Sequence, residues 1–275
     1  MFSSFISVLI FLVSVMAQPA DTILATEKLS LASYNSHGFG AGRPEYIMSL
    51  LKDHDFVFLQ EHWLQEKEID KLECSIEGSR VHGVSGMRSN EFFAGRPYGG
   101  VAIIWPQNLK HNVAPISTNN SRVCAVRIDI DESAVLLCCV YMPEDGNLDG
   151  FVDVLNEIDS ICTAENADKI IIGGDFNVDL ARTGSRNLRA LRIFIENETL
   201  RNAYDFNRVD FTFESKVNRS RSTIDHFIMS ENVFECISDV KVLHEVDNHS
   251  DHSPLVLQLN LEVNYINSIK GGNTK

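Results

Sequence analysis

The stretch Ile170-Ile171-Ile172-Gly173-Gly174-Asp175-Phe176-Asn177 decides the fold. Its β-branched run predicts a buried strand, and the glycine pair indicates a place where the backbone passes close to another group. Asp175 and Asn177 come at the carboxyl end of that strand, the edge of an α/β sheet at which ligands bind. Because side chains alternate along an extended segment, we expect Asp175 and Asn177 to face one pocket while Phe176 turns into the core. Asp and Asn also open ordinary turns, so companions elsewhere in the chain must decide between a site and a turn.

Length and composition favour one globular domain. The chain has 275 residues, of which 44% are hydrophobic and 9% aromatic, and it contains no internal repeat or low-complexity tract. This is ample material for the core of a single large α/β domain. We place that domain at residues 28–263 and expect residues 264–275 to form a flexible carboxyl-terminal tail.

Charge is distributed unevenly along the chain. The net charge of -14 argues against a polyanionic partner, because phosphates are bound largely by Lys and Arg. Residues 182–221, however, hold nine basic residues against five acidic ones, which is net +4 in an otherwise acidic protein. Within this stretch Arg186, Arg189 and Arg192 follow Arg182 at helical spacing and would line one face of a helix, with Leu188, Leu191 and Ile195 toward the core. That face suits a phosphate backbone, and the alternative is a solvated surface.

The amino terminus has the pattern of a secretory signal. Residues 1–17 carry no charge, and the apolar run 5–17 ends with Val15 and Ala17 placed like the small residues before a cleavage site. The run is too short for a membrane span, which needs about 20 apolar residues. The segment lacks a basic residue before the run, so an incidental apolar leader is the alternative. The protein is secreted if the signal is real and nuclear otherwise.

Six cysteines show no metal-binding spacing, so we expect no zinc site. Cys138 and Cys139 are adjacent in an apparent strand and would face opposite sides of the sheet. An even count permits disulfides, and buried free thiols fit equally well.

Polar residues recur where predicted strands end. The apolar patterns predict helices at 44–51 and 148–162, a hairpin turn at 129–132, and strands at 28–35, 56–61, 99–105, 122–130, 134–141, 170–175 and 255–261. Strand ends or their flanks carry Asn35, Glu61, Tyr141, Asp175 and Asp251. Residues 222–228 alternate, with Ile224 expected inward and Asp225 outward.

Taken together, these motifs resemble one family. Its members show, in this order and at about this spacing, the motifs Asn35, Gln60-Glu61, Tyr141-Met142-Pro143, Gly174-Asp175-Phe176-Asn177, Ser222-Thr223-Ile224-Asp225 and Ser250-Asp251-His252. The family is the endonuclease/exonuclease/phosphatase superfamily, and the resemblance spans residues 28–263. Three further stretches are most similar to the endonuclease domain of LINE-type non-LTR retrotransposons: Gln60-Glu61-His62-Trp63-Leu64, Val84-Ser85-Gly86-Met87 and Gly95-Arg96-Pro97-Tyr98-Gly99-Gly100. The resemblance implies a four-layered α/β sandwich with two packed mixed β-sheets flanked by helices.

The resemblance also implies a reaction, the hydrolysis of DNA phosphodiester bonds. Such a site needs a divalent cation on a phosphate oxygen, an activated water and a stabilised leaving group. Oxygen ligands suit Mg²⁺, with Mn²⁺ as the alternative, and Glu61, Asn35 and Asp251 are the ligands that we expect. The catalytic residues would be His252, oriented by Asp225, together with Asp175, Asn177 and Tyr141, supported by Ser222. DNA would contact Arg186, Arg189 and Arg192, and we expect no membrane span and no protein partner.

One departure from the family is His37, because several of its nucleases carry an acid two residues after the first-strand Asn. No reverse-transcriptase sequence follows Lys275, so the chain would be a domesticated or truncated copy of an element, or a secreted relative of deoxyribonuclease. Two alternatives to a DNA-nicking endonuclease remain. One is a broader phosphodiesterase or phosphatase of the same fold, and the other is a catalytically silent binding module.

Overall fold

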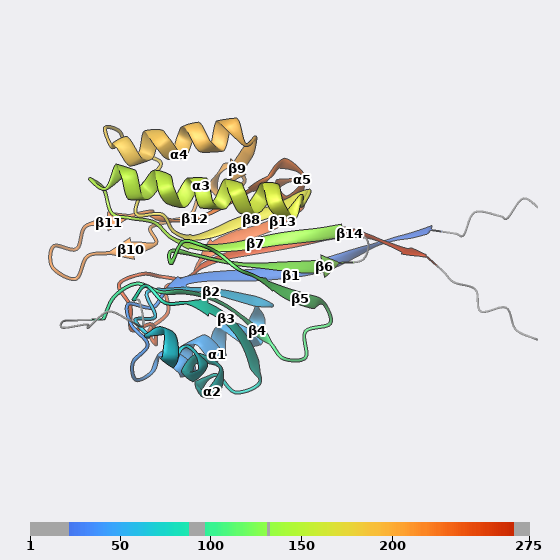
Figure 1. Cartoon of the computed structure of the whole chain (residues 1–275), viewed down its shortest axis with the longest axis horizontal. Coiled ribbons are helices and arrows are strands. Elements are labelled where there is room, and N and C mark those ends of the chain that lie inside the picture. The colour runs from blue at the N-terminus through green and yellow to red at the C-terminus, as the bar shows by residue number, and fades with distance from the viewer. Residues whose placement is uncertain (1–21, 88–96, 131–132, 267–275) are drawn as a thin grey trace, which may run out of the picture.

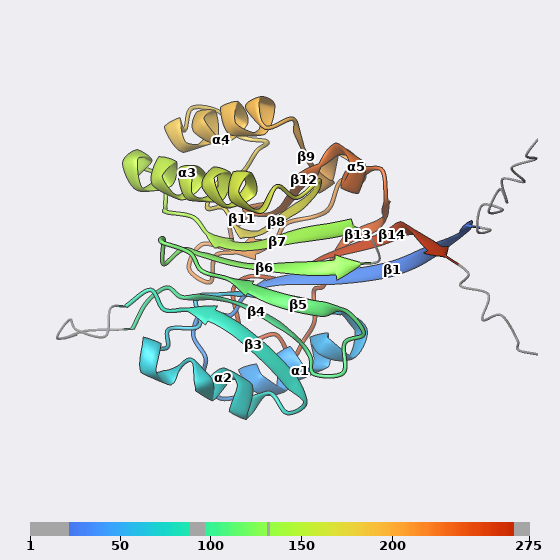
Figure 2. The same cartoon turned by 45° about the vertical axis from the view of Figure 1, so that its right-hand side comes forward.

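Two six-stranded β-sheets pack face to face in the computed structural model, with helices on both outer faces (Figures 1 and 2). The structure describes residues 22–87, 97–130 and 133–266. The expected signal segment at residues 1–17, the Gly95-Arg96 pair and the centre of the expected turn at 131–132 lie outside the described residues. The expected four-layered α/β sandwich of two mixed sheets is confirmed.

The first sheet has the strand order β13-β14-β1-β2-β4-β3. Its strands are β1 (Thr22–Asn35), β2 (Phe56–Gln60), β3 (Ser79–Val84), β4 (Val101–Pro106), β13 (Ile237–Val242) and β14 (Leu255–Ile266). Only β1 and β2 pair in parallel among its described strands. The strand β14 continues to Ile266, three residues into the segment expected as a tail, because it pairs with β1 along its whole length.

The second sheet has the strand order β5-β6-β7-β8-β12-β9. Its strands are β5 (Asn112–Ile116), β6 (Val123–Ile130), β7 (Ser133–Tyr141), β8 (Lys169–Asp175), β9 (Leu200–Asn202) and β12 (Asp225–Ser230). The strand expected in the opening stretch is β8, which lies inside the sheet between β7 and β12. A separate small hairpin consists of β10 (Phe213–Glu214) and β11 (Arg221–Ser222).

Two of the described helices begin where a side chain accepts one of their free backbone N–H groups. Asn147 accepts the Gly150 N–H at the start of α3, and Ser185 accepts the Leu188 N–H at the start of α4. The helices are α1 (Arg43–Asp53), α2 (Asp70–Ser75), α3 (Leu148–Glu165), α4 (Arg186–Asn197) and the single turn α5 (Glu231–Phe234), with short 3₁₀ turns η1 (Glu66–Glu68) and η2 (Ala203–Asp205). Because α4 begins at Arg186, Arg182 lies in the preceding loop and not on the expected helix face.

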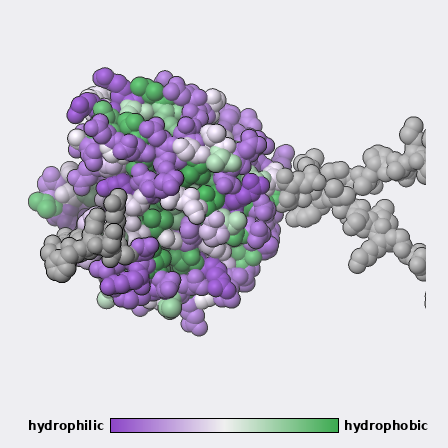
Figure 3. Space-filling view, viewed as in Figure 1, coloured by the Kyte–Doolittle hydropathy of each residue, from purple (hydrophilic) through white to green (hydrophobic). Residues whose placement is uncertain are grey.

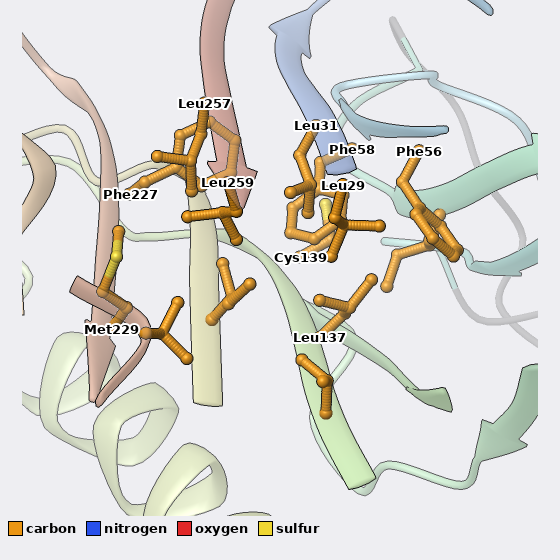
Figure 4. Close-up of a cluster of buried hydrophobic side chains, with 14 of the residues drawn as sticks. Leu29, Leu31, Phe56, Phe58, Leu137, Cys139, Phe227, Met229, Leu257 and Leu259 are labelled. Carbon is orange, nitrogen blue, oxygen red and sulfur yellow. The ribbon is translucent and has the colours of Figure 1, made fainter. Parts of the chain in front are cut away.

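Three apolar layers hold the four structural layers together. The middle layer lies between the sheets, where Leu29 and Phe58 of the first sheet pack with Leu137 and Phe227 of the second sheet (Figure 4). A second layer lies between the second sheet and helices α3 and α4, and a third between the first sheet and helices α1 and α2. Polar side chains cover most of the face seen in Figure 3, so apolar side chains are concentrated inside.

The adjacent cysteines follow the alternation of β7, as expected. Cys139 lies in the layer between the sheets, and Cys138 lies in the layer under the helices. All six cysteines are free thiols. No helix within the described ranges has the length and apolar character that crossing a membrane requires.

Candidate active site

The first sheet delivers two polar side chains to one edge. Asn35 and Gln60 are register partners at the ends of the parallel strands β1 and β2, and Glu61 follows directly. The Asn35 Nδ2 donates to Glu61 Oε1 and to Asp175 Oδ2, each at 2.9 Å, while its Oδ1 accepts the His37 N–H at 3.0 Å. These contacts fix the amide orientation, because the reverse would set its oxygen against two carboxylates. Asn35 therefore connects the two sheets at the site.

The second sheet delivers three more side chains to the same edge. Tyr141, Asp175 and Asp225 are neighbours in register across β7, β8 and β12. Gly174 makes this possible, because its φ is +153° and a Cβ there would lie 1.9 Å from the Val140 carbonyl oxygen. The second glycine of the opening stretch is thus needed where β8 lies closest to β7.

The residues after Asp175 only partly follow the expected alternation. Phe176 is buried in the core, as expected. Asn177 adopts a left-handed backbone with φ 51°, and its N–H donates to Asp175 Oδ1 at 2.9 Å. Its side-chain Nδ2 donates to the Met142 carbonyl oxygen at 2.8 Å. Asn177 thus fixes the Asp175 carboxylate through its backbone, and its own amide is held by the loop after β7.

His252 lies between two buried carboxylates. Its Nδ1 is 2.9 Å from Asp225 Oδ2, and its Nε2 is 3.8 Å from Asp175 Oδ2. Asp225 was expected to point outward, but it is only 1% exposed, because its side chain turns to His252 at the edge between the sheets. The Thr212 hydroxyl accepts the N–H groups of Ile224 and Asp225, which holds this strand end in place.

Burial and charge shift the proton affinities of this group. Burial, against the lowering effect of the His252 charge and with a smaller contribution from the Asp225 charge, raises the pKa of Asp175 to about 7. Burial lowers the pKa of His252, but the charges of Asp225 and Asp175 outweigh it and raise that pKa to about 9. Near neutral pH the imidazole is therefore a cation held by carboxylates. Burial, followed by the charges of Glu61 and Asp175, raises the pKa of Tyr141, so its hydroxyl remains a proton donor.

Glu61 receives a second hydrogen bond that the sequence did not reveal. The Trp63 Nε1 donates to Glu61 Oε2 at 3.0 Å. The Asn35 amide, the Trp63 indole and the Tyr141 hydroxyl that bond to this carboxylate are all neutral groups, so its negative charge remains available to a cation. A tryptophan two residues after an acid has no signal of its own in a sequence, because the contact depends on the backbone turn between them.

The remaining expected residues lie around this centre. Asp251 Oδ1 is 3.3 Å from His37 Nδ1, so the histidine that departs from the family pattern pairs with the acid of the last motif. The Ser250 hydroxyl donates to the Asn35 carbonyl oxygen at 2.7 Å. Ser222 lies on β11, where its carbonyl oxygen accepts the Thr212 N–H at 3.0 Å.

The three arginines of α4 are exposed on the outer layer, and no hydrogen bond or ion pair among the described residues joins them to the carboxylates of the site. The Arg192 Nη2 donates to the Leu180 carbonyl oxygen at 2.9 Å, in the loop that leads from β8 to the helix. Leu188 and Leu191 are buried and Ile195 packs against the same layer, as expected.

Two sets of groups could hold a divalent cation. Ligand atoms of Asp175, Asp225 and His252 lie within 4.8 Å of one another. In that set, however, the imidazole is protonated and already bonded to Asp225. Glu61 fits a cation better, since it is partly exposed and has only neutral donors. The Asn35 oxygen accepts the His37 N–H, and its Nδ2 positions Glu61 and Asp175. Its role as a cation ligand stays a prediction.

Comparison with known proteins agrees with this fold. The profile of the Endonuclease/Exonuclease/phosphatase family matches residues 32–252. The RNA-directed DNA polymerase from mobile element jockey of Drosophila funebris is 26% identical over an alignment of 190 residues, and the match covers 66% of this chain and 19% of that protein. The chain therefore spans about a fifth of this curated relative.

Solved structures share the architecture. The endonuclease domain of TRAS1, a telomere-specific non-LTR retrotransposon, superposes with a TM-score of 0.66 at 17% identity, over 86% of this chain and 99% of that one. The 3' phosphatase NExo from Neisseria, bound to product DNA hairpin, superposes with a TM-score of 0.62 at 17% identity, over 85% and 100%. The resemblance to retrotransposon endonucleases is confirmed by the jockey and TRAS1 matches.

Proposed function

The chain belongs to the endonuclease/exonuclease/phosphatase family, and we propose that it is a Mg²⁺-dependent or Mn²⁺-dependent endonuclease that nicks DNA. One observation carries the proposal. His252, held between Asp225 and Asp175, lies on the same edge as Glu61, and Asn35 bonds to both Asp175 and Glu61. A purely structural edge has no need to bury two carboxylates beside one imidazole, since burying charges is costly.

Each residue has a task that its contacts support. Glu61 would bind the divalent cation with Asp251 nearby, and the cation would offset charge on the phosphate. Asp175 would accept the proton of the attacking water, because its pKa near 7 makes it a base at neutral pH. The His252 imidazolium would face the phosphate through Nε2, while Nδ1 stays on Asp225. The protonated Tyr141 hydroxyl would donate to the phosphate, Asn177 would hold the Asp175 carboxylate, and Ser222 would support the loop.

The DNA substrate is proposed on two grounds. The NExo structure of the same fold holds a DNA hairpin, and the TRAS1 domain is an endonuclease of a mobile element. In this chain residues 182–221 are net basic within an otherwise acidic sequence, and Arg186, Arg189 and Arg192 among them are exposed, which suits a polyanion. Whether the protein acts outside the cell or in the nucleus depends on whether residues 1–17 are a signal.

The test is a plasmid assay with the full chain. Supercoiled plasmid should be converted to the nicked form with Mg²⁺, and EDTA should stop the conversion. Glu61→Gln keeps the shape of the side chain and removes its charge, so nicking should vanish at low Mg²⁺ and return in part at high Mg²⁺. Circular dichroism serves as the control for folding. If Glu61→Gln nicks at the wild-type rate in limiting Mg²⁺, Glu61 is not the cation ligand. A folded wild type that nicks nothing is a phosphatase of the same fold if it hydrolyses a small phosphoester, and a silent module if it does not.

A further inference from the structure

The segment that follows β2 has an unusual backbone. Glu61 and Trp63 both lie in the left-handed region, with φ of 54° and 58°. This region is disfavoured for residues other than glycine, and such residues concentrate where the surrounding structure holds them for a purpose. Two of them, separated only by His62, indicate that the segment is shaped to place their side chains.

Hydrogen bonds hold this segment from two directions. The Gly38 N–H donates to the Glu61 carbonyl oxygen at 2.7 Å, from the loop after β1. The Trp63 N–H donates to the Gly99 carbonyl oxygen at 2.9 Å, from the residues before β4. The backbone on both sides of His62 is therefore tied to two separate loops.

Two glycines leave room for the rings of the segment. A Cβ on Gly38 would lie 2.5 Å from Trp63 Cε3, and one on Gly100 would lie 2.3 Å from His62 Cε1. Both glycines also have positive φ, at +99° and +89°. Side chains larger than hydrogen at either position would displace a ring, so the Trp63 indole occupies a closely fitted place.

The indole connects two acids of the site. Trp63 Nε1 bonds Glu61 Oε2 while Asn35 Nδ2 bonds Oε1, so each carboxylate oxygen has one fixed donor. The other side of the contact is the His37 ring, whose centroid is 4.9 Å from that of Trp63. His37 in turn pairs with Asp251 at 3.3 Å.

We propose that Trp63 is a positioning residue that orients the Glu61 carboxylate for a divalent cation. The inference rests on the proposed function, because it takes Glu61 as the ligand. A neutral N–H donor fixes the carboxylate plane without offsetting its charge, whereas Lys or Arg at this place would compete with the cation. Without the indole N–H the Glu61 carboxylate loses one of its donors and is oriented less firmly, by Asn35 and the Tyr141 hydroxyl. Such outer partners of metal ligands affect metal affinity strongly.

The variant Trp63→Phe keeps an aromatic ring and removes the N–H. Calorimetric titration of the full chain with Mn²⁺ should give an affinity lower by about 10- to 100-fold. Nicking should need correspondingly more Mg²⁺, while turnover at saturating Mg²⁺ changes little. The matched control is Trp105→Phe, because Trp105 is the other tryptophan and packs against Phe56 in the core between the sheets. That variant should bind Mn²⁺ like the wild type.

Glu61→Gln separates the two ways in which the idea can fail. If Glu61→Gln loses Mn²⁺ binding but Trp63→Phe keeps the wild-type affinity, Trp63 does not position the ligand. If Glu61→Gln itself binds Mn²⁺ normally, the proposed ligand is wrong and not only the role of Trp63.

A fluorescence measurement avoids dependence on the folding of Trp63→Phe. In Trp105→Phe the only tryptophan is Trp63, so adding Mg²⁺ should change the fluorescence emission of Trp63. The Mg²⁺ concentration at half of that change should equal the concentration that gives half-maximal nicking. An emission that does not respond while Mg²⁺ supports nicking would overturn the proposal.

Discussion

Two carboxylates share one imidazole at the edge of the sandwich, and this arrangement decides their protonation. Asp225 bonds His252 through Oδ2, and its Oδ1 is buried without a hydrogen bond among the described residues. The charge of Asp225 is therefore directed at His252. Asp175 lies on the far side of the ring and has donors of its own in Asn35 and the Asn177 N–H. The group thus separates into an ion pair, His252 with Asp225, and a base, Asp175.

The His252 and Asp225 pair should behave as a unit. We expect His252→Ala, Asp225→Asn and the double variant to nick DNA at similar low rates, because either change removes the same oriented imidazolium. Single-turnover nicking at saturating DNA and Mg²⁺ measures this. Losses that multiply in the double variant would mean that the two residues act independently.

The pH dependence should follow the same group. With Asp175 active as carboxylate and His252 as cation, kcat/KM should rise as the pH passes about 7 and fall as it passes about 9. Asp225→Asn removes a charge that raises the pKa of His252, so the falling limb of its residual activity should move to lower pH. A falling limb that stays in place would assign it to another group.

The stability of the fold should show the same shifts. Both pKa values lie above the ordinary values of 3.8 and 6.5, so each group favours the folded state at low pH. The contribution of Asp175 is lost as the pH rises toward about 7. The contribution of His252 is complete below about 6.5 and is lost as the pH rises through about 9. Between pH 6.5 and about 9 the melting temperature of the wild type should therefore decline partly because of His252. That part of the decline should be absent in His252→Ala.

At the scale of elements, α4 is the surface that would meet the polyanion. Its register follows from Ser185, which caps the helix, and from Leu188 and Leu191, which are buried against the second sheet. Arg186, Arg189 and Arg192 are left outward, spaced three residues apart. Their contribution to DNA binding stays a prediction.

Changing these three arginines to Gln should weaken DNA binding for all sequences alike. The slope of log affinity against log salt concentration should become shallower by about two to three units, because fewer phosphates are neutralised and fewer counterions are released on binding. Turnover at saturating DNA should change little. The matched control replaces Lys52, Lys71 and Lys241 with Gln, which changes the net charge equally on elements of the first-sheet half. Equal slopes in both triple variants would make α4 a solvated face and favour a small phosphoester substrate.

Elements were predicted well where one residue pattern determines them. The β-branched run of β8 depends on burial alone, and that strand lies within one residue of its expected bounds. The strand β1 ends at Asn35 as expected but begins at Thr22, six residues before the expected start, because its pairing with β14 extends it. Contacts between loops were not predictable. The Trp63 bond to Glu61 and the Thr212 bond to Asp225 join residues whose proximity depends on turns and on sheet order. Arg182 was placed on α4 because spacing alone cannot show where the Ser185 cap begins the helix.

At the scale of the whole molecule, the separation of the two sheets depends on a few close contacts. A Cβ on Gly173 would lie 2.4 Å from Phe227 and 2.9 Å from Phe58, which belong to opposite sheets (Figure 4). Phe58 and Phe227 also pack edge to face, with ring centroids 5.9 Å apart. The missing side chain at Gly173 therefore lets the sheets approach next to the site.

Gly173→Ala should lower the free energy of unfolding by about 1–3 kcal/mol, because the added methyl group overpacks this contact. Urea unfolding followed by circular dichroism measures the change. Gly40→Ala is the matched control, since its Cβ would meet only the Arg43 guanidinium at 4.0 Å. Equal unfolding midpoints for the Gly173→Ala variant and the wild type would show that the sheets can separate there without loss.

The pairing of β1 with β14 shows where this protein can be immobilised, labelled or fused to another domain. Thr22 is the register partner of Ile266, and both strands extend beyond the sandwich as a ribbon (Figure 1). Asn35 lies thirteen residues further along β1, about 40 Å away at the rise of a strand. A linker to a bead, a dye or a second domain that is attached at the outer end of either strand would therefore lie far from the edge that holds Asn35. A short peptide joining Thr22 to Ile266 would permit new chain ends to be opened in a distant loop.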